Sequence, residues 1–184
     1  MAGLSDYTGE FDPEFGPHKL SQEALLRLLG AYPQYMMRMD GLWYFAVTGR
    51  WGDDAAFECD AEVWERLPAL EMRLVSDTLG IRGDDVLTVM KALQASLWRH
   101  VMDLEIDLKS SNHAIVTFRN CPTLAALEKE GRGRENLICR KSEPRRWSST
   151  AAFFNPKIRV TPLILPPREV RSDISCQWEY RLEA

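Results

Sequence analysis

Asp103-Leu104-Glu105-Ile106-Asp107-Leu108-Lys109 alternates charged and apolar side chains without interruption. Successive side chains of a strand point to opposite faces of a sheet, so this alternation predicts a strand with one buried face. Ser110 to His113 has the composition of a turn, and Ala114 to Phe118 is then the returning strand of a hairpin. The chain therefore changes from helical to strand periodicity near Asp103.

Upstream of Asp103 the apolar residues follow helical spacing. Ser21 is a candidate N-cap for a first helix, Pro33 should kink or break it, and the helical pattern returns over residues 35–47. A loop is expected over residues 49–54, and Asp60 is a candidate cap for the next helix. A further amphipathic stripe is formed by Val86, Met90, Leu93, Leu97 and Val101.

Downstream of the hairpin, short helices over 123–130 and about 135–142 precede two more strands. The first of these strands runs through Ile158 and Val160, and Pro162, Pro166 and Pro167 limit it to an edge or end it. The last strand covers residues 174–182. One of its faces should carry Ile174, Cys176, Trp178, Tyr180 and Leu182.

This order predicts an α+β fold in which N-terminal helices pack on a four-stranded antiparallel sheet made of two hairpins. A single domain is expected over residues 21–184, after an extended or disordered lead-in over residues 1–20 that is rich in glycine and proline. The length of 184 residues suits one domain.

Charge and hydropathy narrow the function classes. The net charge of −4 disfavours a general nucleic-acid binder. Apolar runs fall short of membrane-spanning length, and residues 1–19 show no basic-then-apolar signal pattern. A cytoplasmic protein without nucleic-acid or membrane partners is therefore expected.

In that reducing compartment the four cysteines are expected to be thiols or metal ligands. Cys121 follows the hairpin, Cys139 lies in a short helical piece and Cys176 lies on the apolar face of the last strand, so these three could converge at one end of the sheet. Glu143 lies four residues after Cys139, on the same helical face, and Glu135 is a second candidate.

Three thiolates and a carboxylate favour zinc, with iron the less favoured metal. The alternative is that the cysteines are unrelated core residues, because free cysteine is among the most buried residue types. Cys59 has no assigned role.

Two further features could contact a small molecule. Residues 129–146 are basic, and Arg132, Arg134 and Arg140 could hold an anion, although a solvated loop with surface arginines is the more usual explanation. Residues 36–51 are rich in methionine and aromatic residues, and Asp40 and Trp43 could face a ligand there, although such a stretch is also typical of plain core.

Several motifs together resemble an uncharacterised family of anaerobic bacteria and archaea. They are Cys121 to Gly131, Cys139 with Glu143, Phe153-Phe154-Asn155-Pro156, Leu165-Pro166-Pro167-Arg168, Cys176-Gln177-Trp178-Glu179, Asp40-Gly41-Leu42-Trp43 and Ala61-Glu62-Val63-Trp64. More distantly, the cysteine layout is similar to 2-aminothiazoline-4-carboxylate hydrolases and to 4-vinyl reductase-type ligand-binding domains. The second resemblance implies a small-molecule pocket with a zinc held by cysteines and a glutamate.

Three functions remain open from the sequence. The first is a small-molecule-binding domain with a cysteine-rich metal site, whose ligand is anionic or aromatic. The second is a metal-dependent hydrolase of a small anionic cyclic amide or amidine, which rests mainly on the resemblance. The third is a structural or interaction protein that forms a homodimer through the sheet or the first helices.

Overall fold

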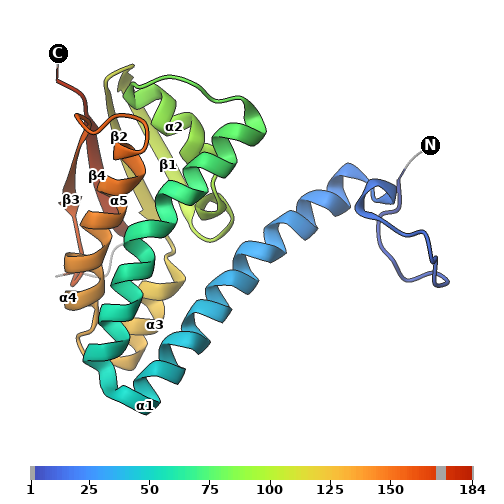
Figure 1. The fold of residues 1–184 in the computed structure, drawn as a ribbon, viewed down its shortest axis with the longest axis horizontal. Helices are drawn as coiled ribbons and strands as arrows, with labels where there is room; N and C mark the ends of the chain where they lie inside the picture. Colours follow the sequence, from blue (N-terminus) through green and yellow to red (C-terminus); the bar gives the residue numbers. More distant parts are fainter. Residues whose placement is uncertain (1–2, 169–172, 184) are drawn as a thin grey trace.

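The computed structural model describes residues 3–168 and 173–183 and has the expected α+β class (Figure 1). The helices are α1 (Gln22–Leu79), α2 (Val86–Gln94), α3 (Pro122–Glu130), α4 (Glu135–Leu137) and α5 (Glu143–Ala152), with short helical turns η1 (Pro17–Lys19), η2 (Leu97–His100) and the π-helical η3 (Ile138–Ser142). The strands are β1 (Asp103–Ser110), β2 (His113–Arg119), β3 (Arg159–Ile164) and β4 (Ile174–Arg181).

The sheet is antiparallel with strand order β1-β2-β4-β3, which confirms the prediction of two hairpins. Leu104 pairs with Phe118, and Val116 pairs with Trp178. These apolar residues face the helices, while the alternate residues carry the polar outer face. β3 lies at an edge and contains Pro162, as its sequence predicted.

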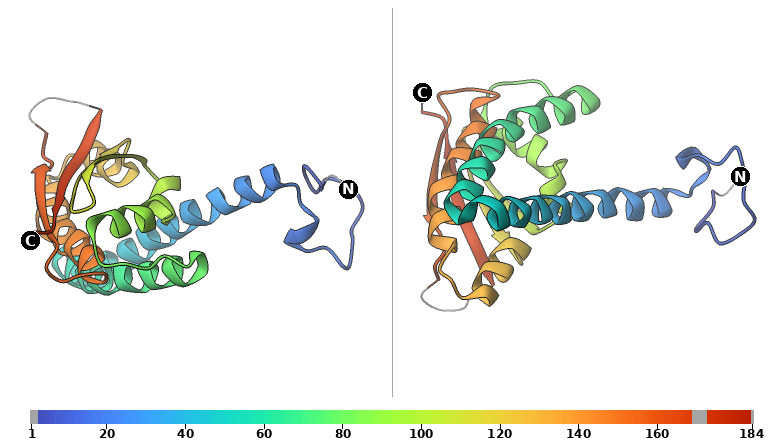
Figure 2. Two further views of the ribbon diagram at one scale, coloured as in Figure 1. Left: turned by 90° about the horizontal axis from the view of Figure 1, so that it is seen from above. Right: turned by 60° about the horizontal axis from the view of Figure 1, so that its bottom comes forward.

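α1 is two helical segments joined by a sharp reversal at Gly52, whose φ of 87° and ψ of 172° are non-helical. We call residues 22–51 the arm and residues 53–79 the return helix. The arm begins at Ser21, whose side chain accepts a hydrogen bond from the Ala24 amide, and projects away from the rest of the molecule (Figure 1 and Figure 2). The left-handed φ at Gly52 explains why glycine stands there.

Two expectations for this region were wrong. Residues 49–54 are helical on both sides of Gly52, because a single glycine provides the reversal and no loop is needed. Asp60 is not a helix cap either. It lies inside the return helix and is buried, with 7% of its surface exposed.

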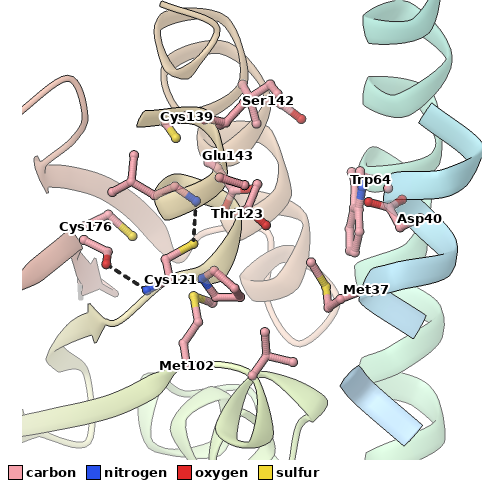
Figure 3. A pocket seen from close by; sticks show the side chains of 18 of the residues that line it. Met37, Asp40, Trp64, Met102, Cys121, Thr123, Cys139, Ser142, Glu143 and Cys176 are labelled. Carbon is pink, nitrogen blue, oxygen red and sulfur yellow. Dashed lines mark hydrogen bonds between the residues drawn. The ribbon is translucent and has the colours of Figure 1, made fainter. Parts of the chain in front are cut away.

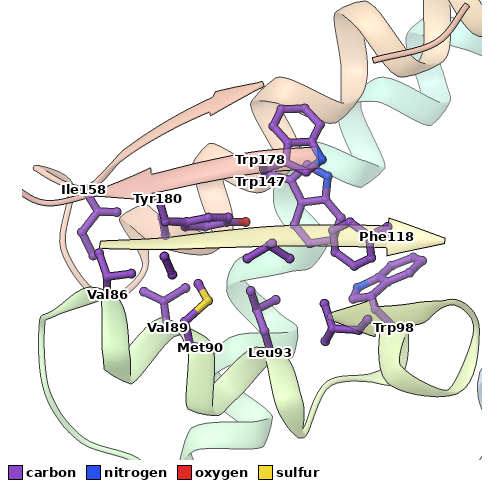
Figure 4. Close-up of a cluster of buried hydrophobic side chains, with 14 of the residues drawn as sticks. Val86, Val89, Met90, Leu93, Trp98, Phe118, Trp147, Ile158, Trp178 and Tyr180 are labelled. Carbon is purple, nitrogen blue, oxygen red and sulfur yellow. The ribbon is translucent and has the colours of Figure 1, made fainter. Parts of the chain in front are cut away.

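The core lies between the inner face of the sheet and helices α1, α2 and α5. Val86, Val89 and Leu93 of α2 are fully buried against the inner face of the sheet, where α2 packs on β1 and β2 and the Tyr180 ring of β4 lies close by (Figure 4). Burial of α2 agrees with the amphipathic stripe seen in the sequence.

Helix α5 was not expected from the sequence, although Pro144 in its first turn, next to Glu143, is a typical start signal. It contributes Trp147, whose ring stacks on Phe118 at a centroid distance of 4.7 Å. α5 thereby completes the layer of helices over the sheet.

Residues 3–20 form an irregular segment that closes on itself through a bridge between Leu4 and Leu20. Within the described ranges, no helix is both long and apolar enough to cross a membrane.

Candidate ligand pocket

A cavity of about 570 Å³ lies where the arm and the return helix approach one end of the sheet. Its walls also include α3, η3 and the start of α5. Much of the lining is apolar and aromatic, including Met37, Tyr44, Trp64, Trp98, Leu124, Leu127 and Trp178. This size falls within the range of small-molecule pockets in proteins.

Two of the cysteines are positioned by the central strands, β2 and β4. Phe118 pairs with Cys176 and Arg119 with Ile174, so Ser175 is an extra residue in a β-bulge of β4. The Ser175 Oγ accepts a hydrogen bond of 3.0 Å from the Cys121 amide. The bulge therefore links the start of α3 to β4.

Each of these two sulfur atoms already accepts a hydrogen bond. The Leu124 amide donates to Cys121 Sγ at 3.4 Å, and Trp178 Nε1 donates to Cys176 Sγ at 3.2 Å. Burial raises the pKa of the Cys176 thiol to about 12, and the nearby charge of Glu143 acts in the same direction. The thiol of Cys176 is therefore protonated at neutral pH.

Cys139 lies in the π-helical turn η3 and lines the same cavity as Cys121, Cys176 and Glu143 (Figure 3). Burial raises the pKa of the Cys139 thiol strongly, and the charge of Glu143 adds to that effect. Nevertheless, among residues 3–168 and 173–183 no three Cys, His, Asp or Glu side chains are arranged to hold one metal ion. The donor types suit zinc, whereas their positions here do not form its coordination shell.

Arg146 of α5 is a buried charged side chain in the pocket wall, with only 6% of its side chain exposed. Its guanidinium carbon lies 3.5 Å from the ring centroid of Trp98 and 4.6 Å from those of Trp64 and Trp147. Nη1 donates to Glu143 Oε1 at 3.0 Å, while the buried Nη2 has no hydrogen-bond partner among the described residues. A buried donor without a partner is costly, so Nη2 is a natural contact point for a ligand.

Asp40 of the arm and Asp60 of the return helix both line the cavity, across the α1 hairpin from each other. The pKa of Asp60 is raised to about 7, mainly by burial and also by the charge of Asp40, while a hydrogen bond from Trp64 opposes the shift. Burial likewise raises the pKa of Asp40. One carboxyl of this pair therefore changes its protonation state near neutral pH.

The predicted substrate-binding arginines have other partners. Arg132 is exposed and pairs with Asp53 and with Glu130. Arg134 lines the cavity, but its Nε donates to Glu130 at 2.7 Å and its guanidinium lies over the Tyr44 ring.

Arg140 is exposed, and its Nε donates to the Pro166 carbonyl. Trp43 is 45% exposed and lies outside the cavity lining, as do Glu135 and the exposed Cys59. Of the five residues that the sequence suggested for substrate binding, the structure places Asp40 and Arg134 in the pocket lining.

A protein-family profile described as "Family of unknown function (DUF6125)" matches residues 18–182. The chain belongs to the DUF6125 family. No significant match was found among curated proteins, and none among solved structures. The profile begins within the segment before the arm and ends near the last residue of β4, so the whole pocket of this DUF6125 member lies inside the matched region.

Sequence reasoning missed Asp60, Trp64, Trp98 and Arg146. Asp60 was assigned to a helix start, and Arg146 was one of several basic residues in a run whose members looked equivalent. A signal was available in the tryptophans: an arginine next to Trp147, in a chain with six tryptophans, could have suggested cation–π packing.

Proposed function

We propose that this protein is a small-molecule-binding domain and that its ligand occupies the pocket between the arm, the return helix and the sheet. The observation that supports this most directly is an aromatic cavity of about 570 Å³ whose charged lining residues include the buried Asp60 and Arg146. Small-molecule sites usually combine apolar walls with a few convergent polar groups.

The charges in the pocket also favour one ligand chemistry. Four carboxyl groups and three arginines line it, and two ion pairs, Arg134 with Glu130 and Arg146 with Glu143, neutralise most of this charge. Outside these pairs Arg38 stands against Asp40 and Asp60, so the lining has a small excess of negative charge, which disfavours an anionic ligand where the dielectric is low. Of the two ligand types that the sequence suggested, the pocket supports an aromatic molecule whose polar group is neutral or positively charged.

Three probes with the same ring test this proposal by calorimetry: benzylamine, benzyl alcohol and benzoate. We expect benzylamine and benzyl alcohol to bind at least about tenfold more tightly than benzoate. Asp40→Asn should weaken benzylamine binding selectively, since it removes a negative charge and leaves the volume nearly unchanged.

A filled pocket provides the control for location. Met37→Trp should abolish binding of all three probes because Met37 lines the cavity, whereas Leu74→Trp, on the exposed side of the return helix, should leave binding unchanged. The proposal would be contradicted if the probes bound Met37→Trp as tightly as the unmodified protein. It would also be contradicted if no probe bound the unmodified protein.

Zinc at Cys121, Cys139, Cys176 and Glu143 stays a prediction of the sequence, with iron as the less favoured metal. A metal there would act as a structural or Lewis-acid centre, and its binding would require these side chains to turn toward one another. Metal analysis of protein purified without chelator tests it. One equivalent in the unmodified protein and a loss in Cys176→Ser supports it, and no metal in either protein rejects it.

The alternative function is a metal-dependent hydrolase of a small anionic cyclic amide or amidine. One observation favours catalysis: Asp60, with a pKa of about 7, suits proton transfer at neutral pH. The excess of carboxyl groups opposes an anionic substrate. Turnover of 2-aminothiazoline-4-carboxylate, with and without added zinc, is the direct assay. Turnover that Asp60→Asn abolishes would establish the hydrolase and replace the binding domain.

A further inference from the structure

We infer that two copies of this chain pair through their arms, using an apolar stripe on the side of each arm that faces away from the pocket. This surface is separate from the ligand site. It is defined by Leu25, Leu28, Tyr32, Tyr35, Met39 and Leu42.

The spacing of these six residues alternates between three and four positions along the arm. That is the a/d pattern of a coiled coil, in which apolar side chains recur every 3.5 residues and insert between those of a facing helix. Leu29 and Trp43 widen the stripe on one side. The pattern therefore indicates packing against another helix.

The described part of this chain does not provide that helix. The six side chains are between 36% and 72% exposed. The arm meets its own core with the opposite side: Met37, Asp40 and Tyr44 line the pocket, and Gln34 Nε2 donates to the His100 carbonyl at 2.8 Å. At 100° per residue these contacts and the stripe lie on opposite faces of the helix.

The exposed area is large enough for a stable dimer. From their exposed fractions, the six side chains with Leu29 and Trp43 present roughly 900 Å² per copy, more than the patches that most monomers leave open. Covering somewhat more than half of it on two copies removes roughly 1,000 Å² from water, which is about the lower limit for a specific interface.

The charges around the stripe favour a second copy over a different partner. A coiled coil that pairs with a different chain selects that chain through charged residues that flank its apolar seam. Here Arg27 pairs with Glu23 on its own arm, while Arg38 and Asp40 line the pocket. The stripe itself carries no charge, so two identical stripes can meet about a twofold axis without repulsion.

Sedimentation of the full chain tests the inference. The unmodified protein, with a chain mass of 21.1 kDa, should sediment as a dimer at micromolar concentration. Tyr35→Glu and Leu42→Glu should each raise the dimer dissociation constant at least about 100-fold, since each places a charge in the buried seam. Leu74→Glu, which is equally exposed but on the return helix, should remain dimeric.

Circular dichroism and thermal unfolding check that the variants fold. Hydrogen exchange on the unmodified protein needs no variant: amides of residues 25–42 should gain protection as concentration rises through the dimer range. A monomer at tens of micromolar, a dimer that survives both stripe substitutions, or a dimer that Leu74→Glu disrupts equally would each overturn the inference.

Discussion

The two ends of the sheet's inner face are built from the same strands but contain different interiors. At one end Ala114 and Tyr180 share an apolar core with Val86, Val89 and Leu93, and all five are fully buried. At the other end Cys176 and Trp178 of β4 border a cavity that is also lined by Arg146, Asp60 and Asp40.

The difference indicates a division of roles within one core. Close packing of apolar groups stabilises a fold, whereas buried charges and empty volume reduce its stability. The apolar packing of α2 against the sheet, which we call the packed end, should therefore contribute more to the free energy of unfolding than the apolar walls of the cavity do. The pocket end should determine binding.

The largest effect is expected from truncation at the packed end. Leu93→Ala should lower the free energy of unfolding by about 2–4 kcal/mol, because the fully buried side chain leaves a cavity. Met37→Ala, at a wall that already borders empty space, should lower it by less than about 1 kcal/mol. Urea unfolding measures both, and equal losses would refute the division between the two ends.

Arg146→Ala should lower the free energy of unfolding by about 2–3 kcal/mol, because it removes three ring contacts and leaves Glu143 without its ion-pair partner. Its exposed neighbour provides a matched control: Arg145→Ala should change stability by less than about 0.5 kcal/mol. If Arg146→Ala were stabilising, the guanidinium would contribute to binding and not to stability. The two ends of the core would then differ more clearly in what they contribute.

The pH dependence of the free energy of unfolding should show how much the buried, ionised carboxylate of Asp60 destabilises the fold. Its pKa is about 7 in the folded protein, against an ordinary value of 3.8. Between these values unfolding releases a proton, so the free energy of unfolding should fall as the pH rises from about 4 to 7 and then level off. Asp60→Asn should remove this fall and be more stable than the unmodified protein by about 2 kcal/mol at pH 8.

Asp54→Asn, an exposed change in the same return helix, is the control for that measurement. Equal slopes for Asp60→Asn and the unmodified protein between pH 4 and 7 would show that Asp60 is not the group responsible.

The smallest expected effect is a difference in the rate at which the cysteine thiols are modified. The exposed Cys59 should react with a thiol reagent at pH 8 at least about tenfold faster than Cys121, Cys139 or Cys176, because burial raises the pKa of all three pocket thiols and the thiolate is the reactive form. Cys59→Ser should abolish the fast phase. A fast phase that persists in Cys59→Ser would mean that solvent enters the pocket end freely.

The sheet could be predicted from the sequence because its signal is local. Alternation at Asp103 to Lys109 and Ile174 to Leu182 shows which face is buried, and Pro162 indicates the edge. Helix α5 and the reversal at Gly52 escaped prediction, since one has a mixed polar composition and the other needs only a single residue in an unusual conformation.

The pocket was harder to predict because its members come from distant segments. Cys121, Cys139 and Cys176 stood out by residue type, whereas Asp60 and Arg146 acquire their unusual surroundings only when α1 folds back against α5. Residue type suggested Arg132 and Arg140 for the same site, but their partners in the fold hold them at the surface.

The two outer strands have a bearing on aggregation. β1 exposes Asp103, Glu105 and Asp107 along one border of the sheet, and β3 places Pro162 in the other. Charges and proline on edge strands discourage a further strand from adding, which is how many natural sheets avoid growing into fibrils. Self-association by strand addition is thereby disfavoured at both borders of this sheet.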